Sequence, residues 1–143
     1  MLKNIPPILS PELMKTLMEM GHGDKIILAD ANFPVVSNAQ RVIRADGHGI
    51  AELLDAILTF LPLDDYIDKP TCVMEPISIE QTPEVWHDYE VIIEKHDQFK
   101  GWEFKERFDF YKEARTCFAI VATSERALKA NIILTKGVIR EQQ

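Results

Sequence analysis

Basic residues and cysteines are both scarce in this chain. Its 143 residues include 16 Lys and Arg against 23 Asp and Glu, so the formal net charge is −7 at pH 7 with neutral His. Because an acidic chain repels phosphate backbones, we expect no nucleic-acid partner. No apolar run approaches the ~20 residues that span a bilayer, and residues 1–9 lack the apolar core of a signal peptide. We therefore expect no membrane partner and a cytoplasmic location.

The two cysteines, Cys72 and Cys117, have apolar neighbours and belong to no CxxC pair. This setting is typical of buried, reduced thiols in a reducing compartment, while the sequence alone leaves a bridge between them open. Catalytic motifs are missing as well, because the chain has no P-loop and no GxSxG around any serine. His87 and His96 fall on opposite faces of one predicted helix, so we expect no metal site.

Apolar residues make up 46% of the chain, enough for a core without disulfides or a structural metal. Short apolar runs predict strands over residues 25–29, 41–45, 71–75, 102–105, 118–122 and 131–134. Four helices are also predicted. Two begin at Ser10-Pro11-Glu12 and at Pro83, and two others cover residues 50–61 and 108–116. This alternation predicts a single α/β domain over residues 1–143, in which helices pack on a largely parallel sheet.

Polar residues gather in two loops beside the strand predicted over residues 25–29. In Met20-Gly21-His22-Gly23-Asp24, the simplest interpretation is a helix terminus in a loop, because glycine commonly follows a helix. The alternative is a functional imidazole that the glycines hold open at the end of the sheet, where α/β domains place their chemistry. Asp30 follows the strand and would orient His22, because a carboxylate partner sets the tautomer of an imidazole and raises its basicity.

Longer sequence blocks extend from one end of the chain to the other. They are Ser10-Pro11-Glu12-Leu13, GHGD (21–24), DANFP (30–34), IRADG (43–47), Arg107-Phe108, Phe110-Tyr111, FAIV (118–121), NIIL (131–134) and Lys136-Gly137. On these blocks, all in one register, the chain resembles the RbsD/FucU family of sugar mutarotases, and within it the branch that acts on fucose. The resemblance covers nearly the whole chain and is weakest over residues 76–106.

The resemblance implies an isomerase that needs no cofactor and interconverts the α and β anomers of L-fucose. Such enzymes remove the proton of the anomeric hydroxyl and protonate the ring oxygen, and closure on the other face of the aldehyde inverts C1. Two proton-transfer groups and a few hydroxyl-binding side chains are sufficient for this reaction. The resemblance also implies a ring-shaped homo-oligomer, commonly a decamer of two pentameric rings, with sites near the subunit boundaries.

The family's site residues carry over to this sequence position by position. His22 and Asp30 match the catalytic histidine and its acidic companion. The matches to sugar-binding positions are Arg107, Tyr111 and Asn131. At one further sugar-binding position, two residues before Asn131, the family usually carries tyrosine and this chain has Lys129. A lysine offers a hydrated charge with donors only, so we expect weaker stacking against the sugar there.

Two other functions remain open from the sequence. One is a non-catalytic sugar-binding or transport-accessory protein on the same fold, in which Lys129 marks lost catalysis. The other is exchange between the pyranose and furanose forms of ribose. Arg107 and the IRADG block favour fucose over ribose, because they resemble the fucose branch.

Overall fold

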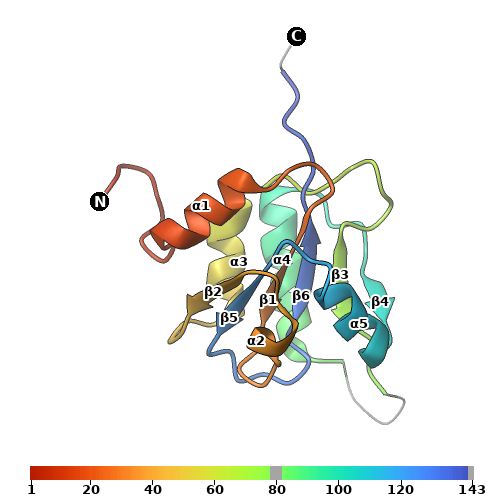
Figure 1. Cartoon of the computed structure of the whole chain (residues 1–143). Coiled ribbons are helices and arrows are strands. Elements are labelled where there is room, and N and C mark those ends of the chain that lie inside the picture. Colours follow the sequence, from red (N-terminus) through yellow and green to blue (C-terminus); the bar gives the residue numbers. More distant parts are fainter. Residues whose placement is uncertain (78–81, 142–143) are drawn as a thin grey trace.

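The computed structural model describes residues 1–77 and 82–141. In these residues, six strands form one mixed sheet (Figure 1). They are β1 (Lys25–Ala29), β2 (Val42–Ala45), β3 (Thr71–Met74), β4 (Glu103–Lys105), β5 (Ala119–Thr123) and β6 (Ile132–Thr135), in the order β2-β5-β1-β6-β3-β4. The last strand, β6, runs antiparallel to β1 and β3, whereas the other neighbouring strands are parallel. The expected α/β fold with a largely parallel sheet is confirmed.

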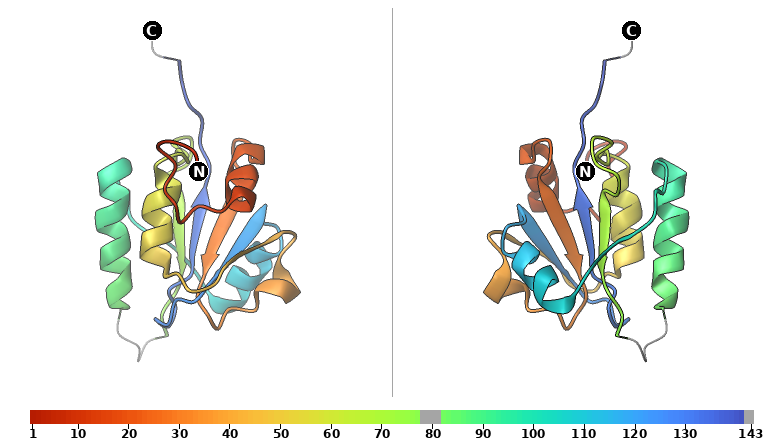
Figure 2. Two further views of the ribbon diagram at one scale, coloured as in Figure 1. Left: turned by 90° about the vertical axis from the view of Figure 1, so that its left-hand side faces the viewer. Right: turned by 90° about the vertical axis from the view of Figure 1, so that its right-hand side faces the viewer.

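Helices cover both faces of the sheet, which explains why its central strands are apolar runs. One face packs against α1 (Pro11–Glu19), α3 (Ile50–Leu58) and α4 (Glu84–His96) through a core that includes Leu13, Leu54 and Tyr89. The other face packs against α2 (Val35–Asn38) and α5 (Arg107–Ala114) through a smaller core around Phe110. Figure 2 shows α3 and α4 side by side, on the opposite side of the sheet from α5.

The local signals for helices are confirmed at the start of α1 and along α3. The Ser10 hydroxyl accepts a hydrogen bond from the Leu13 N–H at 3.1 Å, as expected of an N-cap. The residues of α3 that repeat at helical spacing are buried, but the helix ends at Leu58 rather than at residue 61. Pro62 prevents the helix from continuing beyond Leu61, because proline disfavours helical geometry in the residue before it. The single turn of α2 was not predicted, since so short a helix has no readable periodicity.

Cys72 and Cys117 are both buried free thiols, as the sequence indicated. Burial raises the pKa of each thiol to about 12, so both stay protonated at neutral pH. Among the described residues, no helix combines the length and the apolar character needed to cross a membrane.

The strand directions divide the polar loops between two ends of the sheet. At its carboxyl end, the parallel strands finish and β6 begins, so Asp30, Glu75, Glu106 and Asn131 all lie there. At its amino end, β1 begins and β6 finishes, so Asp24 and Lys136 lie there, and the Lys136 N–H donates to the Asp24 carbonyl at 2.8 Å. Candidate site residues are thus assigned to one end or the other by the strand that each one flanks.

The amino end depends on a close backbone approach at Gly137. Leu63 forms an isolated antiparallel bridge with Lys136, which brings the chain before β3 against the end of β6. A Cβ atom on Gly137 would lie 2.6 Å from the Leu63 carbonyl oxygen and 2.8 Å from the Asp64 Cα, closer than atoms can pack. Glycine is therefore required at this position.

We expect Gly137→Ala to lower the free energy of unfolding by about 1–3 kcal/mol, because backbone atoms would have to shift to admit the new methyl group. The measurement is denaturant unfolding at neutral pH. Gly21→Ala is the matched control, since a Cβ there meets Asp24 Oδ2 at an ordinary 3.6 Å. Equal stability changes in the two variants would contradict the close approach at Gly137.

Candidate active site

Five of the six predicted site residues line one pocket at the carboxyl end of the sheet. The pocket has a volume of about 430 Å³ and includes Asp30, Arg107, Tyr111, Lys129 and Asn131. These residues come from three segments: the loop after β1, the first half of α5, and the turn that leads into β6. The structure therefore brings together residues that are as much as 101 positions apart in the sequence.

Asp30 occupies the buried floor of this pocket. Its side chain follows β1 directly, and only 6% of the residue is exposed. The Asp30 N–H donates to Asn131 Oδ1 at 2.7 Å, and the Asn32 N–H donates to Asp30 Oδ1 at 3.0 Å. Burial raises the pKa of Asp30, and hydrogen bonds from the backbone N–H groups of Asn32 and Ala130 oppose the rise. The carboxyl group is thus held in place by donors, and its neutral form is favoured relative to an exposed aspartate.

The first turns of α5 supply one wall of the pocket. Arg107 opens the helix and is exposed, with its guanidinium carbon 5.7 Å from the centroid of the Tyr111 ring. Tyr111 lies about one turn further along and is half-buried, with its ring 5.6 Å from that of Phe33. A fixed cation and a phenol therefore face the pocket from adjacent positions on one helix.

Lys129 and the chain after β3 form the opposite wall. The Lys129 ammonium donates to the Glu75 carbonyl oxygen at 3.2 Å, which joins the two segments at the pocket. The pocket is also lined by Met74, Pro76 and Ile77, which were not predicted from the sequence. The available signal was weak, because the family resemblance fades after residue 75 and apolar wall residues look like core residues.

His22 lies at the other end of the sheet, so its expected pairing with Asp30 is wrong within one chain. The imidazole precedes β1 and Asp30 follows it, and a strand of five residues separates them by about 16 Å at ~3.3 Å per residue. His22 Nε2 instead lies 3.0 Å from Oδ1 of Asp64. Residues close in sequence were assumed to be close in space, but an extended strand carries its two flanking loops apart.

The residues that surround His22, Asp64 and Tyr66, were not predicted from the sequence. The side chain of Asp64 is only 4% exposed, and its Oδ1 also accepts the Tyr66 N–H at 3.1 Å. The Tyr66 ring lies 4.9 Å from the imidazole, and Arg140 binds Asp65 through two hydrogen bonds. Nothing in the spacing between His22 and Asp64, 42 residues, indicates the contact. The close approach permitted by Gly137 produces it.

The contact with Asp64 uses one ring nitrogen of His22 and leaves the other, Nδ1, for a different partner. A buried carboxylate on Nε2 favours the tautomer with its proton there, so the Nδ1 lone pair is the free acceptor. The His22 side chain is 42% exposed, so part of the imidazole is accessible from outside the chain. The Asp64–His22 pair thus has the form of an oriented general base.

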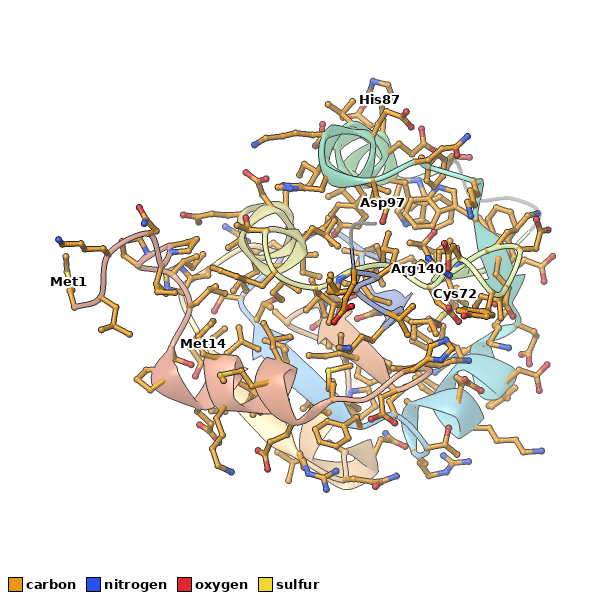
Figure 3. All side chains as sticks on the ribbon, turned by 90° about the horizontal axis from the view of Figure 1, so that it is seen from above. Met1, Met14, Cys72, His87, Asp97 and Arg140 are labelled. Atoms are coloured by element: carbon orange, nitrogen blue, oxygen red, sulfur yellow. The ribbon has the colours of Figure 1, made fainter. Side chains whose placement is uncertain are left out.

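The remaining histidines do not contribute to the pocket. His87 points away from the body of the protein on α4 (Figure 3), and its side chain is 80% exposed. His96 Nε2 lies 2.6 Å from Asp55 Oδ1, and His48 lies 4.0 Å from Glu52. Over the described part of the chain, no group of three or more His, Cys, Asp or Glu side chains is placed to hold a metal ion.

A model of the RbsD / FucU transport protein family matches residues 3–139 of this chain. The chain belongs to the RbsD/FucU family. Among its relatives, the human fucose mutarotase is 49% identical over 96% of this chain and 94% of its own length. The L-fucose mutarotase of Actinobacillus pleuropneumoniae is 44% identical over 96% of this chain and 97% of its own length.

A solved structure from this RbsD/FucU family agrees closely with the fold. The crystal structure of the fucose mutarotase from Streptococcus pneumoniae, in complex with L-fucose, superposes with a TM-score of 0.94. It is 50% identical to this chain and covers 97% of it and 100% of its own length. The family resemblance seen in the sequence is therefore confirmed.

The raised pKa of Asp30 predicts how stability changes with pH. Because the folded state binds this proton more tightly than the unfolded state, the contribution of Asp30 to stability is fully present below the ordinary pKa of 3.8 and is lost as the pH rises through the folded-state value. We expect the stability of the wild type relative to Asp30→Asn to fall as the pH rises from below 3.8 toward neutral pH. Denaturant unfolding of both proteins across this range measures the difference. A constant difference would contradict the raised pKa.

Proposed function

We propose that this chain interconverts the α and β anomers of L-fucose, as a sugar isomerase that uses no cofactor. The observation that carries the proposal is its near-complete superposition, at half identity, on a fucose mutarotase bound to L-fucose. Full-length relatives of the same activity support it. The proposal places the sugar in the pocket around Asp30.

The lining of the pocket suits a 6-deoxy sugar. Asp30, Arg107, Tyr111 and Asn131 offer acceptors and donors to the hydroxyl groups of a sugar. The apolar side chains of Phe33, Met74 and Ile77 suit its methyl group and the C–H faces of the ring. Lys129 contributes a charged donor from the remaining side. This division matches a ligand that is polar at its hydroxyls and apolar at one corner.

Ring opening needs only two proton transfers. A base takes the proton of the anomeric hydroxyl, an acid donates a proton to the ring oxygen, and the bond between C1 and the ring oxygen breaks. The open-chain aldehyde then closes on its other face with the transfers reversed. Asp30 supplies a carboxyl group whose burial favours the proton-donating form, and an imidazole acceptor supplies the other half.

That imidazole comes from a second copy of the chain in this proposal. His22 and Asp30 lie at opposite ends of β1, and no histidine is among the described residues that line the pocket. In turn, His22 is not among the described residues that line this pocket in its own chain. A closed ring places His22 of the partner subunit at each Asp30 pocket. We propose a ring-shaped homo-oligomer, a decamer of two five-membered rings.

We expect His22→Ala to lower the rate of anomer exchange by about 10²–10⁴-fold, the usual contribution of general acid–base catalysis. Saturation transfer between the α and β signals of L-fucose in NMR measures the exchange at equilibrium. His87→Ala, which removes an exposed imidazole on α4, is the control and should match the wild type.

Near wild-type exchange in a correctly assembled His22→Ala protein would overturn the assignment of His22. Binding of L-fucose without any acceleration by the wild type would favour the sugar-binding or transport-accessory alternative. Faster exchange of D-ribose forms than of L-fucose anomers would favour the ribose alternative.

Mixing two inactive variants tests whether a site contains residues of two subunits. We expect random co-assembly of His22→Ala with Asp30→Asn, at equal amounts, to restore about one quarter of the wild-type rate, since one neighbour pairing in four unites an intact His22 with an intact Asp30. Each variant alone should remain inactive. No recovery in verified mixed oligomers, or a monomer by light scattering at micromolar concentration, would contradict the shared site.

A further inference from the structure

Two aromatic side chains of α4 reach the turn that precedes β6. The Trp86 indole N–H donates to the Lys129 carbonyl at 2.9 Å, and the Tyr89 hydroxyl donates to the Ala130 carbonyl at 2.9 Å. Both residues are buried, with Trp86 3% exposed and Tyr89 fully covered. Two neighbouring carbonyl groups of this turn are therefore bound by side chains that lie one helical turn apart on α4.

The turn held in this way has a strained backbone. Lys129 has φ of 53°, in the left-handed region that residues with a Cβ rarely occupy. Such a conformation persists when surrounding contacts fix it. The bonds from Trp86 and Tyr89 are such contacts, and without them the Ala130 carbonyl would be buried with no donor.

The same turn carries the groups that hold Asp30. The Ala130 N–H and the Asn131 side chain bond to the Asp30 carboxylate, and Asn131 Oδ1 accepts the Asp30 N–H at 2.7 Å. Lys129 projects from the same turn to the far wall of the pocket. A change in the position of residues 129–131 therefore moves the floor and one wall of the pocket together.

We propose that Trp86 and Tyr89 are positioning residues for the sugar site, which act through residues 129–131 on Asp30. The inference rests on the proposed function, because it takes the Asp30 pocket as the place where L-fucose binds. Neither aromatic residue touches the sugar in this proposal. Each one fixes the backbone from which the sugar-binding groups project.

A purely structural role is the alternative, and Trp102 provides the matched control. Its indole N–H also donates to an oxygen at 2.9 Å, but that oxygen belongs to Glu90 on α4, away from the pocket. Trp102 is similarly buried at 7%, and its ring lies 6.4 Å from that of Trp86. Trp86→Phe and Trp102→Phe therefore remove the same kind of group from neighbouring places in one core.

The test compares Trp86→Phe, Tyr89→Phe and Trp102→Phe with the wild type as assembled oligomers. We expect the concentration of L-fucose that half-saturates exchange to rise about three- to tenfold in Trp86→Phe and Tyr89→Phe, the usual range for one lost hydrogen bond. It should stay unchanged in Trp102→Phe. A structural role alone would lower the folded fraction and hence the maximal rate, without a change in the half-saturating concentration.

An unchanged half-saturating concentration in Tyr89→Phe, which loses a single oxygen atom, would overturn the inference even if Trp86→Phe fails to fold. An equal rise in Trp102→Phe would overturn it as well. If the wild type binds L-fucose without exchanging its anomers, the dissociation constant measured by calorimetry replaces the half-saturating concentration. The same three variants are then compared, with the same expected results. A wild type that neither binds nor exchanges L-fucose overturns the proposed function itself, which is a distinguishable result.

Discussion

The buried hydrogen bond from the Asp30 N–H to the Asn131 side chain joins segments 101 residues apart and determines where the pocket forms. It requires that β1 end where β6 begins, which only an antiparallel β6 beside β1 allows. Once this bond is made, the walls follow from their own strands: α5 comes after β4, and the Glu75 segment comes after β3. The polar floor is therefore a product of the sheet topology.

The same antiparallel pairing separates the two groups with acid–base chemistry. A buried carboxyl group lies at the carboxyl end of β1, and an imidazole oriented by Asp64 lies at the amino end. Each group is prepared for proton transfer where it stands, yet neither can reach the other within one chain. If a subunit boundary unites the two ends, as proposed above, activity depends on assembly, because an isolated chain would then hold half of each site.

Local sequence patterns predicted most of the fold and indicated Asp30, and the family resemblance supplied the other pocket residues, but neither predicted the relation between the two ends of the sheet. Strand ends agree to within one residue, because buried apolar runs bounded by loop residues are a strong signal. The family resemblance identified Arg107, Tyr111, Lys129 and Asn131, because each of them alone looks like an ordinary surface, core or strand-entry residue. The contact of Asp64 with His22 had no signal at all, because it depends on a backbone approach between residues 63 and 137. Contacts of this kind are set by packing, which periodicity does not encode.

The order of strands in the sheet also bears on how the chain acquires its fold during synthesis. In the sheet, β1 pairs with β5 and β6, and β2 pairs with β5. The first two strands to be synthesised therefore have no hydrogen-bonding partner until residues 119–135 emerge from the ribosome. Among the strand pairs of the described residues, only that of β3 with β4 can form earlier. Loop closure over such sequence separations is slow, and unpaired apolar strands are prone to aggregate while they wait. The nascent chain is therefore an expected client of chaperones, and a ribosome stalled ahead of residue 119 would leave the apolar strands β1 and β2 unpaired and prone to aggregate.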